Sequence, residues 1–515
     1  MTASRPETAI NTLVGDALFI GGGGPDYGVV QSLRLDKANR HGLIAGATGT
    51  GKTVTLQTLA EGFSDAGVPV FLTDVKGDLS GLAAAGAPVD KLKSAFEARA
   101  AQIGFDLCYR SYPVEFWDIT GAKGIPVRMT VSELGPVLLS RLLDLSPAQE
   151  GVLHIAFHLA DEEKLALLDL SDLRAMLHHV GERASELTMR YGTVDKRSIG
   201  AIQRQLLMLE SEGATGFLGE PALELADMIR IAEDGRGQVN ILAADKVINT
   251  PKTYATFLLW LLSELFETLP EIGNPEKPVF VLFFDEAHLL FDDAPKPLLD
   301  KVEQVVRLIR SKGVGVYFVT QNPTDIPEDV LSQLGNRVQH ALRAFTAKDQ
   351  KELEQAAKTY RANPDFGIIE AIRDVGTGEA VTSFLDSKAV PGQVERSLIR
   401  PPVSLLGPVP AATRERVIDQ SALYAKYRTA LDRESAAELL QARMVADDPQ
   451  APRSAPESLS RGRRYRGANS PEAKPQRRSS SDTLMETFGK SIVRQIGTQG
   501  GKAIVRGILG SLFRK

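Results

Sequence analysis

An eight-residue glycine-rich segment constrains the fold of this chain more than any other feature. It matches the pattern G-x-x-x-x-G-K-[ST] of phosphate-binding loops with the residues Gly46-Ala47-Thr48-Gly49-Thr50-Gly51-Lys52-Thr53. The apolar residues 42–45 before it predict a short buried strand, and residues 54–61 after it have helical spacing. In this order the N–H groups of the loop and of the helix N-terminus point at phosphate oxygens, and glycine lets the backbone approach without a Cβ clash. The segment therefore predicts a nucleotide site.

The side chains at the end of this loop have separate expected roles. Lys52 is expected to reach the β- and γ-phosphates, and the hydroxyl of Thr53 is expected to bind Mg²⁺. Val54, at the start of the helix, completes the set of residues expected to hold ATP. The alternative is a glycine-rich turn that matches the pattern by accident, and the strand and helix on its two sides argue against it.

A second polar pair follows the wholly apolar residues 279–284. Asp285 has the position of a Walker B aspartate, which holds Mg²⁺ together with Thr53, and Glu286 is placed to polarise an attacking water. Gln321 ends the next expected strand, 316–321, and is placed to hydrogen-bond the γ-phosphate or that water. A solvated turn after a strand is the alternative for the acidic pair. Together with the P-loop, the pair favours ATP hydrolysis.

Strands and helices alternate along most of the chain, which predicts an α/β fold with a doubly wound, mostly parallel sheet. Ligands in such sheets lie at the carboxyl ends of the strands, where Gly46, Asp74, Asp285 and Gln321 are all expected. Residues 130–232 have helical spacing throughout, and Ser146-Pro147-Ala148-Gln149 has the pattern of a capping box. The glycines 21–24 predict a turn or flexible loop, since no helix pattern follows them.

These patterns divide the chain into six segments. We expect a short N-terminal lead-in at 1–41, an ATPase core at 42–129 and 236–402, a helical insertion at 130–235, a C-terminal helical extension at 403–448, a disordered linker rich in Pro, Ser and Arg at 449–480, and a basic amphipathic tail of two short helices at 481–515.

Charge is unevenly distributed along the chain. The net charge is −5, yet the residues from Ala451 onward hold fourteen Lys/Arg and four Asp/Glu, so that stretch carries +10 and the rest carries −15. An acidic body argues against a globally basic nucleic-acid binder, although it leaves room for a local basic channel. With one cysteine, no secretory signal and a longest apolar stretch of only 257–262, the chain is expected in the cytoplasm.

Three stretches of the sequence resemble the HerA/FtsK superfamily of ring-forming DNA-pumping ATPases. They are residues 40–53 around the P-loop, the Asp285-Glu286-Ala287-His288 box and Val319-Thr320-Gln321-Asn322-Pro323. Residues 124–128, 135–143 and 391–396 are similar to the bacterial HerA-like group typified by YjgR. The resemblance implies a RecA-like core with a helical subdomain, a homohexameric ring and ATP-driven movement of duplex DNA.

The resemblance also implies roles for arginines. Arg40 matches the arginine just before the P-loop, which would lie near the nucleotide of its own chain, and Arg310 falls where the arginine supplied to a neighbouring subunit is expected. Arg307, Arg337 and Arg343 are other arginines that could face the γ-phosphate. HerA carries a β-barrel before its P-loop that residues 1–41 are too few to form, so its nuclease partner is not transferred to this chain.

Two functions remain open from the sequence. The first is an ATP-driven DNA translocase or helicase-like hexamer, which the resemblance favours. The second is an ATPase that remodels or regulates a protein partner without moving along DNA, which the acidic body favours. Stimulation of ATP hydrolysis by DNA distinguishes the two.

The tail also generates a prediction. Residues 484–515 carry six Lys/Arg and one acid, Glu486, among apolar residues that recur every four positions. This pattern suits an anionic membrane surface, a tethered DNA-binding arm, or a helix that packs on its own ring.

Deletion after Ser480 should separate these three. Loss of binding to anionic liposomes, with ATPase and ring intact, is the result expected for a membrane contact. Weaker and less salt-sensitive DNA binding is expected for an arm, and loss of the ring for a structural helix.

Overall fold

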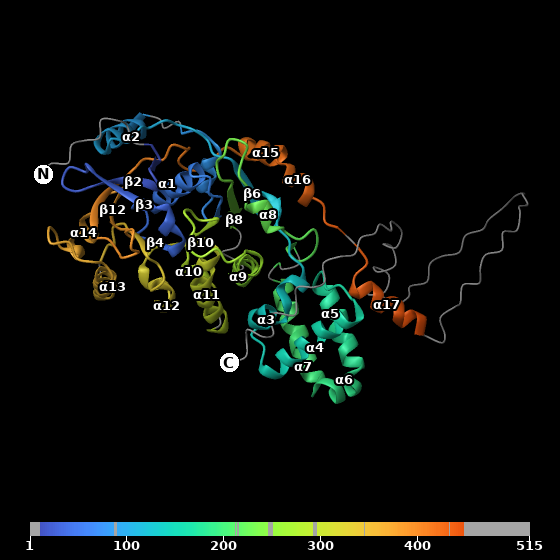
Figure 1. Ribbon diagram of the computed structural model, residues 1–515. Helices are drawn as coiled ribbons and strands as arrows, with labels where there is room; N and C mark the ends of the chain where they lie inside the picture. Colours follow the sequence, from blue (N-terminus) through green and yellow to red (C-terminus); the bar gives the residue numbers. More distant parts are fainter. Residues whose placement is uncertain are drawn as a thin grey trace, which may run out of the picture. The chain divides into compact units, whose positions relative to one another are not determined.

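The computed structural model describes residues 11–447 except 87–89, 212, 214–215, 246–250, 292–295, 345 and 432. The expected linker at 449–480 and the amphipathic tail at 481–515 lie outside the described residues. Figure 1 shows the arrangement of helices and strands along the chain. Among the described residues, no helix combines the length and apolar character needed to cross a membrane.

Thirteen strands of the described chain form one sheet. They are β1 Leu13–Val14, β2 Ala17–Gly23, β3 Val29–Arg34, β4 Gly42–Ala45, β5 Val70–Asp74, β6 Val114–Asp118, β7 Ile125–Pro126, β8 Val239–Ala243, β9 Phe280–Phe284, β10 Val314–Thr320, β11 Asn336–Gln339, β12 Glu379–Ser383 and β13 Glu395–Ile399. The order β7-β6-β8-β5-β9-β10-β4-β11 is parallel throughout, as the sequence predicts. β12, β13 and β2 continue it in antiparallel pairing, and β1 and β3 each pair with β2.

The helices lie on both faces and beyond one end of this sheet. They are α1 Lys52–Asp65, α2 Asp90–Ile103, α3 Val131–Leu142, α4 Pro147–Glu163, α5 Leu170–Glu182, α6 Ala184–Tyr191, α7 Lys196–Ser211, α8 Leu225–Met228, α9 Pro251–Thr268, α10 His288–Phe291, α11 Lys296–Ile309, α12 Glu328–Leu331, α13 Ala347–Lys358, α14 Ile368–Asp374, α15 Ala411–Gln420, α16 Ala422–Tyr427 and α17 Ala436–Asp447. Short 3-10 turns include η1 Leu35–Arg40, η2 Leu79–Ala83 and η5 Arg310–Lys312.

Apolar side chains on the two faces of the sheet form two separate cores. Successive residues of a strand point to opposite faces, so Phe280, Leu282 and Phe284 of β9 pack with α9 and α11. Val281 and Phe283 of the same strand pack with α1 on the other face. Figure 1 shows α1 and α15 on one side of the strands and α9 and α11 on the other. Burial on both faces explains why the central strands are apolar throughout.

Within the expected helical insertion, α3 to α7 are gathered in one group (Figure 1). Ser146 begins α4 with the expected capping box, in which its N–H donates to Gln149 Oε1 at 2.9 Å. Leucines of α4, α5 and α7 belong to the core that also includes α9 and α11. The C-terminal helix α17 packs on α5, and the N–H of Ala437 donates to Asp172 Oδ1 at 2.9 Å. The insertion therefore shares its core with the sheet.

The structure corrects the expectation for glycines 21–24. Gly21, Gly22 and Gly23 are the end of strand β2, and only Gly24 lies in a turn. A Cβ on Gly21 would overlap the carbonyl oxygen of Leu398 in β13, and a Cβ on Gly22 would overlap that of Tyr27. The glycines therefore allow close approach within a strand, which a local pattern of turn residues does not reveal.

An ion pair between Glu61 of α1 and Arg400, which follows β13, lies entirely inside the protein. Both side chains are 0% exposed, and Arg400 Nη1 lies 2.8 Å from Glu61 Oε2. Three further guanidinium hydrogens are used by the carbonyl oxygens of Phe19 at 3.0 Å, Thr58 at 2.6 Å and Pro401 at 3.3 Å. Complete pairing and hydrogen bonding are the conditions under which a buried charge is tolerated.

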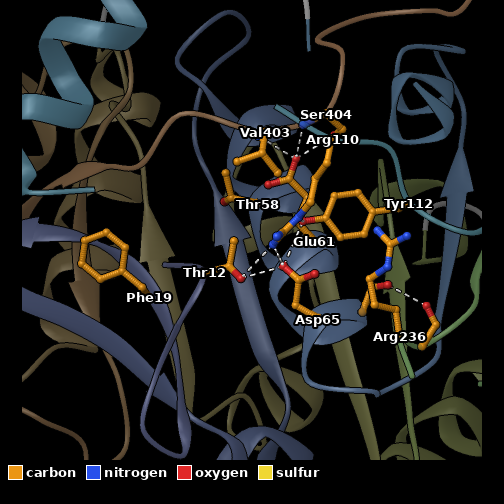
Figure 2. A network of polar contacts seen from close by, with 12 residues as sticks. Thr12, Phe19, Thr58, Glu61, Asp65, Arg110, Tyr112, Arg236, Val403 and Ser404 are labelled. Atoms are coloured by element: carbon orange, nitrogen blue, oxygen red, sulfur yellow. Dashed lines mark hydrogen bonds and ion pairs between the residues drawn. The ribbon is translucent and has the colours of Figure 1, made fainter. Parts of the chain in front are cut away.

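The second oxygen of Glu61 ties the helix to the chain beyond β13. Glu61 Oε1 accepts from the N–H of Val403 at 3.0 Å, the N–H of Ser404 at 2.9 Å and the hydroxyl of Ser404 at 2.6 Å. Figure 2 shows Glu61 pointing at Val403 and Ser404, with Thr58 one turn earlier on the same helix. The helix that starts at the P-loop is thus fixed to residues almost 350 positions away in sequence.

We expect Glu61→Leu to be strongly destabilising, because Arg400 would remain buried without a counter-charge. The expected loss in the free energy of unfolding is about 3–5 kcal/mol, measured by urea unfolding of the full chain. The double variant Glu61→Leu/Arg400→Met removes both charges and should be more stable than the single variant. As a control, Glu303→Ala breaks an ion pair with the exposed Arg307 and should cost at most about 1 kcal/mol. Equal losses for Glu61→Leu and Glu303→Ala would contradict the expectation.

Candidate nucleotide-binding site

The P-loop connects the end of β4 to the start of α1, as the sequence predicts. Gly46, Gly49 and Gly51 have φ values of 153°, 78° and 116°, which L-residues rarely adopt. A Cβ on Gly46 would lie 2.5 Å from the Cβ of His340, and one on Gly51 would lie 3.3 Å from the backbone N of Gly378. Backbone conformation therefore favours glycine at all three positions, and the close approach of His340 adds a second reason at Gly46.

Lys52 is folded back onto the loop that it follows. Its Nζ donates to the carbonyl oxygens of Gly46 at 2.5 Å and Ala47 at 3.2 Å, and the residue is only 7% exposed. Burial lowers the pKa of Lys52, and the nearby charge of Glu286 works in the opposite direction. The ammonium group thus lies within the loop, held by carbonyl oxygens that phosphate oxygens could replace.

Asp285 and Glu286 follow β9 at the edge of the sheet where β4 delivers the P-loop. Phe318 of β10 lies opposite both Phe284 and Leu43, which places the ends of β9 and β4 at similar heights. Both acids are buried, and the N–H of Asp285 donates to Thr73 Oγ1 at 2.9 Å. Burial, with the charge of Glu286, raises the pKa of Asp285 to about 7. A nearby cation would favour the ionised form.

Glu286 has a backbone conformation that is unusual for a non-glycine residue, with φ of 47°. Three side chains contact its carboxylate. Its Oε1 forms an ion pair with Lys76 Nζ. Its Oε2 accepts from Gln321 Nε2 at 3.4 Å and lies 3.4 Å from His288 Nδ1. Burial opposes ionisation of Glu286, but the hydrogen bond and charge of Lys76 outweigh it and lower the pKa.

Asp74, at the end of β5, has a structural role in this site. Its carboxylate accepts from the N–H of Gly77 at 2.8 Å and from the N–H of Leu79 at 3.3 Å, which fixes the turn that carries Lys76. Burial and the charge of Asp78 raise the pKa of Asp74 to about 6. The sequence places Asp74 at this edge but does not reveal that Lys76, two residues later, contacts Glu286.

A cavity of about 400 Å³ lies beside the P-loop. Ala47 and Thr48 line it from the loop, and Gln321 and His288 line it from the ends of β10 and β9. Arg343 also lines this cavity. Of the arginines that the sequence suggests as contacts of the γ-phosphate, Arg343 is the one that lies in the cavity beside the P-loop. Asp325, Asp349 and Glu352 form an acidic wall of the cavity. The α13 residues in this wall carry no sequence motif that would have identified them.

His340 connects the P-loop helix to the antiparallel part of the sheet. It is fully buried, and burial lowers its pKa to about 4, so the ring is neutral near pH 7. Its Nδ1 donates to the carbonyl oxygen of Glu379 at 2.8 Å, since a carbonyl can only accept, and its Nε2 accepts from Thr55 Oγ1 at 2.8 Å. In addition, the N–H of Gly378 donates to Thr50 O at 3.1 Å. These contacts fix the P-loop and the first turn of α1 against the residues that follow β11 and precede β12.

The structure does not bring Arg40 to the P-loop of its own chain, contrary to the expectation. Arg40 precedes β4 and Arg310 precedes β10, so both lie at the amino ends of parallel strands, the edge opposite the P-loop. Asn39 Nδ2 donates to Arg310 O at 3.2 Å, which confirms that the two segments are neighbours. Arg337 is occupied by the carbonyl oxygens of Leu334 and Leu331. Neither Arg40 nor Arg310 therefore lies at the sheet edge that carries the P-loop.

The residues at the carboxyl edge fit a magnesium nucleotide. The P-loop amides and Lys52 suit phosphate oxygens, while the Thr53 hydroxyl and the Asp285 carboxylate are hard oxygen ligands of the kind that Mg²⁺ prefers. Among the described residues, no group of three or more His, Cys, Asp or Glu could hold a metal ion by itself. A divalent ion at Thr53 and Asp285 would therefore take its other ligands from phosphates and water.

Comparison with known proteins gives several similarities. A curated relative, "Probable helicase MJECL08" of Methanocaldococcus jannaschii, is 27% identical over 154 residues, which cover 28% of this chain and 28% of that protein. The matched region thus spans less than a third of that relative. The conjugative coupling protein TrwB, in its unbound form, is 14% identical with a TM-score of 0.48, covering 74% of this chain and 89% of that one. VirB4 of Thermoanaerobacter pseudethanolicus is 15% identical with a TM-score of 0.47, covering 75% and 97%.

A family-level match covers far more of the chain than the curated relative does. The sequence profile of the family described as "Helicase HerA-like C-terminal" matches residues 24–515, which include the P-loop, the acidic pair after β9 and Gln321. On this match, the chain belongs to the HerA-like helicase C-terminal family.

Proposed function

We propose that this chain hydrolyses ATP with Mg²⁺ and uses the energy to drive a ring-shaped motor. One observation carries the hydrolytic part of the proposal. The buried carboxylate of Glu286 follows β9 and the P-loop lysine Lys52 follows β4, and only β10 lies between these strands, so both side chains lie at the same edge of the parallel sheet. A site that only bound nucleotide would not need a buried base beside the phosphate loop.

Each residue then has a separate task. Lys52 exchanges its bonds to Gly46 and Ala47 for phosphate oxygens, and the loop amides bind the remaining phosphate charge. Mg²⁺, when bound at Thr53 and Asp285, neutralises charge on the phosphates. Glu286 orients the attacking water and accepts its proton, while Gln321 is positioned by its hydrogen bond to Glu286 to contact the same water or the γ-phosphate.

Glu286→Gln should keep nucleotide binding and lose turnover by about 10²-fold or more, because the amide cannot accept the proton. Lys52→Ala should impair both binding and turnover. Phosphate release assays and calorimetric titration with ADP measure the two properties separately. Glu303→Gln, at a half-buried position of α11 that pairs with the exposed Arg307, is a matched control that should change neither. A wild-type rate in Glu286→Gln would show that another group activates the water.

We propose further that the motor is a homohexamer in which Arg310 acts on the nucleotide of a neighbouring subunit. Arg310 lies at the sheet edge opposite its own P-loop, so it could reach a nucleotide only across an interface between subunits. Membership of the HerA-like family supports the ring. Head-to-tail contacts between subunits close into rings of this kind.

Mixing two inactive variants tests this arrangement. Arg310→Ala keeps the P-loop but lacks the arginine, and Lys52→Ala keeps the arginine but lacks the P-loop lysine. If the arginine acts across an interface, equal mixing before assembly should restore about a quarter of the wild-type ATPase rate. Mass photometry with an ATP analogue and Mg²⁺ measures the size of the particle. A monomer that hydrolyses ATP, or a mixture without regained activity, would contradict the proposal.

DNA is the proposed track of the motor, and family membership supports it. The net charge of −15 outside the C-terminal stretch instead favours the second candidate, an ATPase that remodels or regulates a protein partner. We propose a cytoplasmic location in both cases, with a peripheral membrane contact through residues 481–515 as a further proposal.

Linear duplex DNA should stimulate ATP hydrolysis about fivefold or more if the two sites are coupled. The rate is measured with and without DNA at two salt concentrations, since phosphate contacts weaken as salt rises. Glu286→Gln serves as the blank for contaminating ATPases. An unchanged rate at both salt concentrations would favour the second candidate function.

A further inference from the structure

Lys76 is a second lysine in the ATP site, and the P-loop pattern does not account for it. It lies in the turn after β5 that the carboxylate of Asp74 fixes through the N–H groups of Gly77 and Leu79. The side chain is 44% exposed, whereas that of its partner Glu286 is 6% exposed. The backbone of this turn is therefore held in place, while the long side chain has free space into which it can move.

In this structure, Lys76 neutralises the carboxylate that the proposed reaction needs as a base. The ion pair occupies Glu286 Oε1, and Gln321 and His288 contact Oε2. An ammonium group that contacts this carboxylate stabilises its ionised form, which makes it a poorer proton acceptor. This arrangement describes a site at rest, because a base that is paired with an ammonium is less able to take a proton from water.

Lys76 is also close to the place where phosphates are expected. Its partner Glu286 follows β9, and only β10 separates β9 from β4, the strand that leads into the P-loop, so Lys76 and Lys52 lie at the same edge of the sheet. Two neighbouring ammonium groups repel one another, and a triphosphate between them would remove the repulsion. ADP, which lacks the third phosphate, offers less charge to compete with Glu286 for Lys76.

We propose that Lys76 binds the γ-phosphate of ATP and leaves Glu286 when it does so. Lys76 thus senses the nucleotide state: with ADP or no nucleotide it holds Glu286 neutralised, and with ATP it moves and frees Glu286 to act on water. The inference rests on the proposed ATP site, and it names a substrate contact that the P-loop does not supply. A ligand can shift such an equilibrium only through its different affinity for the two states, and the γ-phosphate supplies that difference.

A double-mutant cycle separates a phosphate contact from simple neutralisation of Glu286. Affinities for ADP and for the β,γ-imido analogue of ATP, each with Mg²⁺, are measured by calorimetry on the full chain. Glu286→Gln should bind the analogue more tightly than the wild type, because Lys76 is already released. Lys76→Gln in the Glu286→Gln background should then weaken the analogue about tenfold, or 1.4 kcal/mol, and leave ADP within about twofold.

The Glu286→Gln background makes the test decisive. If Lys76 only neutralises Glu286, Lys76→Gln has nothing left to neutralise there, and analogue affinity will not change; that result would overturn the proposal. Lys76→Arg should retain most of the preference for the analogue. Lys123→Gln, which breaks the exposed pair with Asp245, is the matched control and should change neither affinity. Unchanged ADP binding in the Lys76 variants shows that the P-loop remains folded.

Binding is read without turnover, so the two proposals can fail separately. A chain that binds the analogue as described but releases no phosphate would contradict the proposed hydrolysis and retain the Lys76 contact. If the chain hydrolyses ATP, but Lys76→Gln leaves the analogue affinity unchanged in the Glu286→Gln background, the proposed hydrolysis is retained and the Lys76 contact is contradicted.

Discussion

The buried ion pair between Glu61 and Arg400 is the interaction on which the arrangement of the site depends. A charge in the interior is tolerated when it has a partner of opposite charge and further hydrogen bonds, and both groups have these. Glu61 lies in α1, the helix that begins at Lys52, and Arg400 follows β13. The pair therefore holds the P-loop helix against the antiparallel part of the sheet. His340 and Gly378 continue this connection up to the loop itself.

Parallel pairing of the strands places the side chains of the candidate site at one edge of the sheet. The P-loop, the acidic pair and Gln321 follow neighbouring strands, so residues from distant parts of the chain share a small volume of low dielectric. Charges in such a volume act strongly on one another. Asp285 is pushed toward its neutral form, and Glu286 toward its ionised form by Lys76. The opposite edge carries Arg40 and Arg310, which precede β4 and β10.

The helical insertion does not stand apart from this core. Its leucines belong to the hydrophobic cluster that includes α9 and α11. Helix α11 follows β9, the strand that immediately precedes Asp285 and Glu286. Close-packed interiors transmit small displacements instead of absorbing them. The packing of α11 and α9 therefore joins the sheet to the insertion in one core. The two faces of the sheet, in contrast, belong to separate cores.

The sequence by itself determined the local features of this protein. The P-loop, the acidic pair after an apolar strand, the parallel sheet and the capped helix at Ser146 all follow from spacing over a few residues, and the structure contains each of them. Only the tertiary structure decided that the glycines before residue 24 form a strand, that Arg40 lies far from the P-loop, and that Lys76 pairs with Glu286. The physical reason is the separation along the sequence of the residues that determine each feature. Helix caps and strand patterns depend on neighbours in sequence, whereas close backbone approach, buried ion pairs and the two edges of a sheet depend on segments that meet only after the chain has folded.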